Sequence, residues 1–219
     1  MKNKSLSIFL IMLGLLLNIP AGNAQNTDGG ATVILKKVAA QYKTYSTLQF
    51  RYTLKTTKDN KTLKTEQGTF ALKGNKYHAT YSGQSFFCNG ITVWNYQKAT
   101  NEVSIYEYDP TDDNNIMNPQ RILTSWDKKF RAKYIRDEYV NGISLMLIDL
   151  TPKTSQSYYR IRLFINKANN RITRISMYDK DSTIYSYYIE QFKVNLPLPD
   201  SYFTFTPSKY PGIEINDMR

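Results

Sequence analysis

Apolar and polar side chains alternate with a period of two in one segment of the chain after another. Residues 48–54 (LQFRYTL) are the clearest case, because every second side chain is apolar and all of these lie on one face of a strand. Similar segments recur between turn signals such as Asn89-Gly90 and Asn141-Gly142. The further expected strands are 64–72, 77–81, 86–88, 91–96, 103–108, 130–135, 144–150, 158–165, 172–178, 183–192 and 202–206. About ten short strands predict a mainly β fold, in which one antiparallel sheet curls into a barrel or part-barrel.

Two segments depart from this period and are predicted to be helices. In residues 31–45 the apolar side chains recur every three or four positions, which is the spacing of one helix face. These apolar residues are Ile34, Val38, Tyr42 and Tyr45. Residues 118–126 follow a polar break, and Asn118 before Pro119 suits the start of a second, shorter helix.

The first 24 residues have the pattern of a cleavable signal peptide. Two lysines precede an almost wholly apolar run over residues 6–19, and a small-residue motif ends at Ala24, before Gln25. The alternative is an uncleaved membrane anchor, but the run falls short of the roughly 20 residues that span a bilayer. We therefore expect export, cleavage between Ala24 and Gln25, and a single mature domain of residues 25–219.

A single cysteine limits how this domain is held together. Cys88 has no partner for an internal disulfide, so the fold has to depend on packing. It also lies far from the apolar run, so we expect a mature protein without an N-terminal lipid anchor. The formal net charge is +11, or +9 without Lys2 and Lys4, and the basic residues are dispersed along the strands. This pattern favours anionic partners but not nucleic acid, which is bound by clustered basic residues.

The chain offers few residues suited to catalysis or metal binding. His78 lies in an expected strand away from any nucleophile motif, and Cys88 directly precedes a hairpin turn. The acidic residues Asp109, Asp112 and Asp113 lack the glycine and terminal glutamate of a calcium loop. No histidine or cysteine pair has metal-ligand spacing, and no glycine-rich phosphate loop is present. We expect neither an enzyme nor a cofactor or metal site.

The sequence is strongly aromatic, with 18 tyrosines, 10 phenylalanines and 2 tryptophans. Aromatic side chains favour strands, but they also line apolar binding clefts. Composition does not separate these uses. Because the sequence shows no set of residues suited to catalysis, the aromatic composition favours a binding protein over an enzyme.

One short motif suggests a modification. Asp181-Ser182-Thr183 resembles the O-glycosylation signal of some Bacteroides-type bacteria, with Ser182 or Thr183 as the acceptor. A plain hairpin turn is the alternative interpretation.

Several stretches, in order along the chain, resemble the outer-membrane lipoprotein carrier family, LolA. They are the first helix leading into residues 48–54, residues 68–77 (GTFALKGNKY), residues 87–96 (FCNGITVWNY) and residues 203–217 (FTFTPSKYPGIEIND). Residues 118–126 (NPQRILTSW) stand where the family places a lid helix. The sequence is thus similar to a divergent, Bacteroides-type member of the family.

This resemblance implies both a fold and a function. The family fold is an unclosed antiparallel β-barrel whose concave side is covered by helices, with a hydrophobic cavity between barrel and helices. Its members are soluble periplasmic carriers that hold the acyl chains of lipoproteins. They receive this cargo from an inner-membrane ABC transporter and pass it to an outer-membrane acceptor. The resemblance therefore implies a non-enzymatic carrier with these partners, which we expect to be a monomer.

Candidates for the cavity lining follow from the faces of the expected strands and lid helix. The candidates are Phe50, Tyr52, Phe70, Leu72, Tyr77, Trp94 and Tyr96 from the strands, and Ile122 and Leu123 from the helix. For each of them ordinary core packing is the alternative, since a barrel interior and a ligand cavity use the same side chains.

The sequence departs from the family at the lid latch. Well-studied members latch the lid with an arginine in the first long hairpin, and residues 72–75 (LKGN) contain none. Lys73 can take this place as a donor, although it lacks the planar fork of arginine.

Other functions on the same fold stay open at this point. One is a periplasmic binding or sensing module for a different lipid or a protein partner. Another is the outer-membrane acceptor of the same fold, which is usually lipid-anchored, whereas this chain lacks the cysteine for an anchor.

Overall fold

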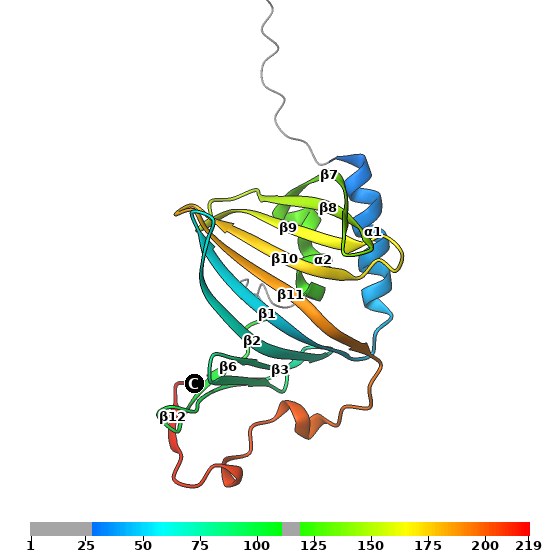
Figure 1. Ribbon diagram of the computed structural model, residues 1–219. Helices are drawn as coiled ribbons and strands as arrows, with labels where there is room; N and C mark the ends of the chain where they lie inside the picture. The colour runs from blue at the N-terminus through cyan, green and yellow to red at the C-terminus, as the bar shows by residue number, and fades with distance from the viewer. Residues whose placement is uncertain (1–27, 111–118) are drawn as a thin grey trace, which may run out of the picture.

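The computed structural model describes residues 28–110 and 119–219 (Figure 1). The expected signal peptide with its cleavage site at Ala24 and Gln25 lies outside these residues. So do the polar segment 111–117 and the expected helix cap, Asn118.

The described residues form two α-helices, two short 3-10 helices and twelve strands. The helices are α1 (Gly29–Lys43), α2 (Pro119–Lys129), η1 (Asp200–Phe203) and η2 (Pro207–Lys209). The strands are β1 (Leu48–Lys58), β2 (Lys61–Lys73), β3 (Lys76–Tyr81), β4 (Gln84–Cys88), β5 (Thr92–Gln97), β6 (Glu102–Glu107), β7 (Phe130–Val140), β8 (Ile143–Pro152), β9 (Tyr158–Asn166), β10 (Ile172–Asp179), β11 (Thr183–Val194) and β12 (Glu214–Asp217).

All twelve strands belong to one sheet in the order β12-β6-β5-β4-β3-β2-β1-β11-β10-β9-β8-β7. Neighbouring strands pair antiparallel, except that β12 runs parallel to β6. The sheet curls around α1 and α2, and its two ends, β12 and β7, are not paired with each other in the described residues (Figure 1). The expectation of a mainly β, unclosed antiparallel barrel with covering helices is confirmed.

Strand β1 shows how the period-two pattern positions this sheet. Its side chains alternate between buried and more exposed from Leu48 to Leu54, as the sequence predicts. The strand pairs on one side with β2 and on the other with β11, which joins the two halves of the sheet. Phe50 lies directly opposite Phe70, so the buried rows of adjacent strands coincide and form a continuous apolar face.

Helix α1 begins two residues earlier than the sequence pattern predicts and also ends two residues earlier. Asp28 is the reason for the early start, because its Oδ1 accepts a hydrogen bond of 2.6 Å from the backbone N–H of Gly30. The Asp28 backbone N–H also donates to the Ala132 carbonyl of β7, at 2.8 Å. The N-terminus of α1 is thereby fixed to one end of the sheet.

One expected strand is absent. The alternating aromatic residues of 202–206 predict an extended segment, but residues 200–203 form the 3-10 helix η1. The fixed backbone angle of Pro199 leads into this turn, and the Tyr202 N–H donates to the Pro199 carbonyl. The alternation at Phe203 and Phe205 still buries both side chains, without strand pairing.

Position 68 of β2, beside β1 on the concave face, requires a residue without a side chain. It lies opposite Tyr52, and a Cβ at this position would overlap both the Tyr52 hydroxyl and the Thr80 carbonyl. The Tyr52 hydroxyl donates to this same carbonyl at 2.9 Å. The glycine therefore makes room for a tyrosine whose hydrogen bond is satisfied inside the sheet.

We expect Gly68→Ala to lower the free energy of unfolding by about 1–3 kcal/mol, because Tyr52 has to leave its position. Gly29→Ala is the matched control, since a Cβ there meets nothing within 4 Å. The control is expected to leave stability unchanged or to raise it by up to about 1 kcal/mol. Urea unfolding of both variants measures this, and equal stability of the two would contradict the prediction.

Candidate functional site

The concave face of the sheet and the two helices share one large apolar cluster. From the sheet it includes Phe50, Tyr52, Phe70 and Leu72, all buried, with Tyr77 packed against it. Aromatic rings run across the strands within it. Phe50 stacks on Phe70 with ring centroids 5.3 Å apart, and Phe70 faces Tyr77 at 6.5 Å. These five sequence-predicted candidates therefore lie together on the concave side.

Helix α2 contributes the other side of this cluster. Ile122 and Leu123, the two candidates from the expected lid helix, are buried against the sheet and α1. Trp126 is buried with them, although it is not among the sequence-predicted candidates. Its spacing of four and three residues from Ile122 and Leu123 is that of one helix face and was the signal available. The carbonyls of Asp127 and Lys129 accept hydrogen bonds from the Lys153 side chain and backbone, which fix the end of α2.

Helix α1 is held by apolar packing and by hydrogen bonds to the sheet. Ala31, Leu35, Val38 and Tyr42 are fully or almost fully buried in the shared cluster. The Tyr42 hydroxyl accepts a hydrogen bond of 3.1 Å from the backbone N–H of Ile172. Burial raises the pKa of Tyr42 well above its usual value, so this hydroxyl stays neutral. Together with the Asp28 contacts to β7, this ties α1 to the sheet at both of its ends.

Trp94 and Tyr96 lie on the opposite face. Asn95, between them in β5, pairs with Phe86 and shares its face, so its two neighbours project from the convex side. There they belong to a separate cluster with Phe87, Val103 and Phe205. The Tyr96 ring lies 4.4 Å from that of Tyr210, which comes from the C-terminal segment. The structure therefore does not bring these two candidates together with the other seven.

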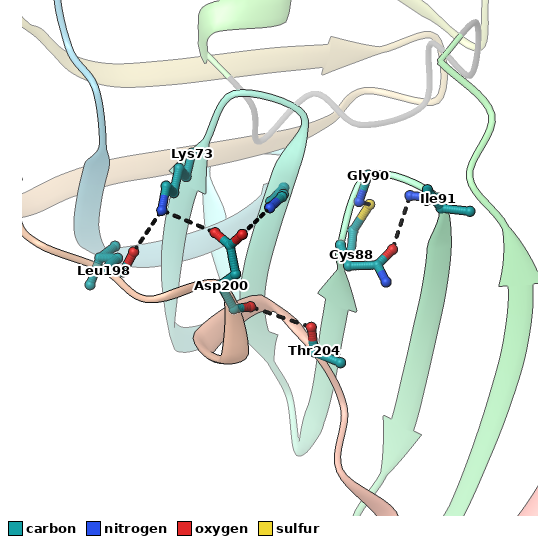
Figure 2. A network of polar contacts seen from close by, with 9 residues as sticks. Lys73, Cys88, Gly90, Ile91, Leu198, Asp200 and Thr204 are labelled. Carbon is teal, nitrogen blue, oxygen red and sulfur yellow. Dashed lines mark hydrogen bonds and ion pairs between the residues drawn. The ribbon is translucent and has the colours of Figure 1, made fainter.

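The C-terminal segment covers the convex side of β3 to β6 before it ends in β12 (Figure 1). Lys73, the candidate for a lid latch, binds this segment. Its Nζ donates to the Leu198 carbonyl and to Asp200 Oδ1, both at 3.0 Å (Figure 2). Lys76 donates to Asp200 Oδ2 at 2.6 Å, and these two lysines lower the pKa of Asp200. Such an exposed ion pair adds little stability, so aromatic packing is the stronger attachment.

His78 lies under the same segment. Its ring stacks on Phe87 with centroids 4.1 Å apart and meets Tyr202 edge-on at 5.1 Å. Burial lowers the pKa of His78 to about 4, because its charged form loses solvation there. Cys88 is buried on the concave side of β4, where its thiol accepts a hydrogen bond from the Gly90 N–H, as Figure 2 shows. Packing accounts for both residues.

The described residues were also compared with the requirements of a metal site and of a membrane-spanning helix. In residues 28–110 and 119–219, no group of three or more histidine, cysteine, aspartate or glutamate side chains is placed to hold a metal ion. Nor does either helix of this part of the chain have the length and apolarity to cross a membrane.

Comparison of the sequence with protein families identifies the fold. The family described as "Outer membrane lipoprotein carrier protein LolA" matches residues 43–206. The chain belongs to this family. Membership places this LolA-family protein among binding modules of the lipoprotein-carrier type. The chain has no significant match among curated proteins.

Solved structures agree with this fold. An uncharacterized conserved protein from Thermus thermophilus superposes with a TM-score of 0.59 at 13% identity, over 86% of this chain and 99% of that chain. LprF from Mycobacterium bovis gives a TM-score of 0.50 at 11% identity, over 80% and 98% of the two chains. A LolA superfamily protein from Nitrosomonas europaea, at 17% identity, gives 0.45 over 80% and 97%. At such identities the likeness to the first two structures establishes the fold and nothing further.

We expect His78 to make the protein less stable in mild acid. Between pH 6.5 and pH 4 the unfolded chain binds a proton at His78 and the folded chain does not, so stability falls as the pH falls through this window. Because His78 is partly exposed, the loss is expected to be on the order of 1–2 kcal/mol.

His78→Phe keeps the aromatic stacking and removes the titration. The difference in unfolding free energy between the native protein and this variant should therefore change between pH 6.5 and pH 4. Urea unfolding at a series of pH values measures this difference. A constant difference would show that His78 titrates at its ordinary pKa in the folded protein.

Proposed function

We propose that the protein is an exported periplasmic carrier that holds the acyl chains of lipoproteins between the concave face of its sheet and helix α2. The observation that supports this most is the shared apolar cluster, in which Ile122, Leu123 and Trp126 of α2 are buried together with the aromatic rows of β1 and β2. Membership of the lipoprotein carrier family agrees with it.

The free energies favour exchange of α2 for an acyl chain. Burial of three large apolar side chains of α2 is worth about 1.5–3 kcal/mol each, or roughly 5–9 kcal/mol in all. Transfer of an acyl chain from water gains about 0.8 kcal/mol per methylene, or roughly 12 kcal/mol for a chain of about 16 carbons. One acyl chain taken from water can therefore separate α2 from the sheet and lie between them, and the helix can return when the cargo leaves.

The two helices have different roles in this exchange. Helix α1 stays in place, since Asp28 binds β7 and Tyr42 binds Ile172. Helix α2 leads directly into β7 at Phe130, and Lys153 holds that end. We therefore place the pivot of the lid at residues 129–130, with the Ile122 end moving furthest.

The two tryptophans allow a direct test, because Trp126 faces the concave cluster and Trp94 projects from the convex side. A synthetic lipopeptide with brominated acyl chains quenches tryptophan fluorescence on contact. In Trp94→Phe, which retains Trp126, we expect strong quenching. In the matched variant Trp126→Phe, which retains Trp94, we expect little. Quenching of Trp94 instead, or of neither tryptophan, would contradict acyl binding beneath α2.

The finer role requires an experiment in cells. As a shuttle, the protein receives lipoproteins from an inner-membrane ABC transporter and delivers them to an outer-membrane acceptor. Its depletion is then expected to leave outer-membrane lipoproteins at the inner membrane, as membrane fractionation can show. An unchanged distribution, with a free lipid or a protein partner co-purifying, would point instead to a binding or sensing module of the same fold.

A further inference from the structure

The convex face of β7 to β10 carries many cations and few carboxylates. The concave side of these strands is occupied by Ala132, Ile148, Ile161 and Ile175, so the alternate side chains project outward. The outward cations are Arg131, Lys133 and Arg136 of β7, Arg160 and Arg162 of β9, and Arg174 of β10. Asp149 of β8 and Glu138 of β7 are the carboxylates on this face. We call it the cationic face.

The single charge of Asp149 does not neutralise both of the arginines that contact it. Arg162 binds it with two hydrogen bonds, Nε to Oδ1 at 2.6 Å and Nη2 to Oδ2 at 2.7 Å. Arg160 Nη1 lies 3.5 Å from the same Oδ2. One carboxylate thus serves two guanidinium groups, while Glu138 pairs with Arg136 at 2.8 Å. The six cations and two carboxylates leave an excess of positive charge.

Aromatic rings hold the arginines of this face in place. The Arg160 guanidinium lies 3.7 Å from the centroid of the Tyr178 ring, and that of Arg174 lies 3.3 Å from the centroid of Phe164. Within the described part of the chain, Nε of both arginines is buried without a hydrogen-bond partner. Stacking therefore fixes both guanidinium groups, and Arg160 in addition shares the single carboxylate of Asp149 with Arg162.

Exposed cations and an exposed tyrosine lie on this face. Arg131, Lys133 and Arg136 are exposed along β7, and Tyr159 beside Arg160 is 49% exposed. Tyrosine suits the boundary between membrane and water, and basic residues near an anionic membrane are each attracted to it. We propose that the cationic face docks the protein on the surface of anionic phospholipid bilayers.

The spread of the charges favours a lipid surface over an acidic protein. The cations are distributed over three strands of one sheet face instead of converging on a single point, which matches a plane of many phosphate groups. The face also lies on the side of the sheet away from α1 and α2 (Figure 1). A docked protein would therefore leave both helices free, and the inference does not depend on which cargo the concave side takes.

Vesicle co-sedimentation of the whole protein tests this. Binding is expected to vesicles of equal parts phosphatidylcholine and phosphatidylglycerol, to fall with added salt, and to be weak on phosphatidylcholine alone. The triple variant Arg131→Ala, Lys133→Ala and Arg136→Ala should bind the anionic vesicles on the order of 100-fold more weakly. The matched control replaces the exposed Lys36, Lys37 and Lys43 of α1 by alanine and should lose less than about threefold.

Three results would overturn the proposal. The first is equal binding to both kinds of vesicle, and the second is an equal loss in the α1 control. The third is binding to soluble polyglutamate but not to vesicles, which would indicate an acidic protein partner. Should the triple variant fail to fold, Lys133→Glu changes one exposed position on β7 and is expected to weaken vesicle binding about tenfold.

Discussion

The structure depends on covering one apolar face of an open sheet. A closed barrel buries its interior by itself, whereas the described sheet ends at β12 and β7, which do not pair with each other, and needs other elements to exclude water from its concave side. The sequence has no disulfide to help, because Cys88 is the only cysteine. The two helices provide the cover, and their buried side chains form one apolar cluster with the aromatic rows of β1 and β2. The apolar concave face that has to be covered for the fold to be stable is thus also a surface suited to acyl chains.

Smaller apolar clusters on the convex side also have to be covered, and two different elements cover them. Beside β4 to β6, the C-terminal segment places Phe205 and Tyr210 over Phe87, Val103 and Tyr96. Beside β8 and β9, the cluster of Leu145, Leu147 and Phe164 is covered in part by the stacked guanidinium of Arg174. An arginine stem can cover apolar surface while its charge stays at the boundary with water. The cationic face is therefore also part of how the sheet is packed.

The packing of the two helices connects stability with the proposed function. Hydrogen bonds at both ends supplement the packing of α1. Helix α2 buries Ile122, Leu123 and Trp126 in the shared cluster, and Lys153 binds its end. Because apolar contacts are non-directional, an acyl chain can replace those that these three side chains make. A carrier can thus release one element of its core while the remainder stays folded.

By itself, the sequence determined the strands, the two helices and their approximate bounds, since side-chain period and turn residues are local properties of the chain. Seven of the nine cavity candidates could be grouped on the concave side, because their strands alternate regularly or their helix has one apolar face. The tertiary structure alone decided where Trp94 and Tyr96 lie, because an aromatic residue suits either face of a strand and only the pairing of Asn95 with Phe86 chooses between them. It likewise decided that residues 200–203 turn instead of extending and that Lys73 binds Asp200. The contact of Lys73 with Asp200 joins segments more than a hundred residues apart, which no local pattern records. The turn includes the hydrogen bond from the Tyr202 N–H to the Pro199 carbonyl, which the alternation of aromatic residues does not indicate.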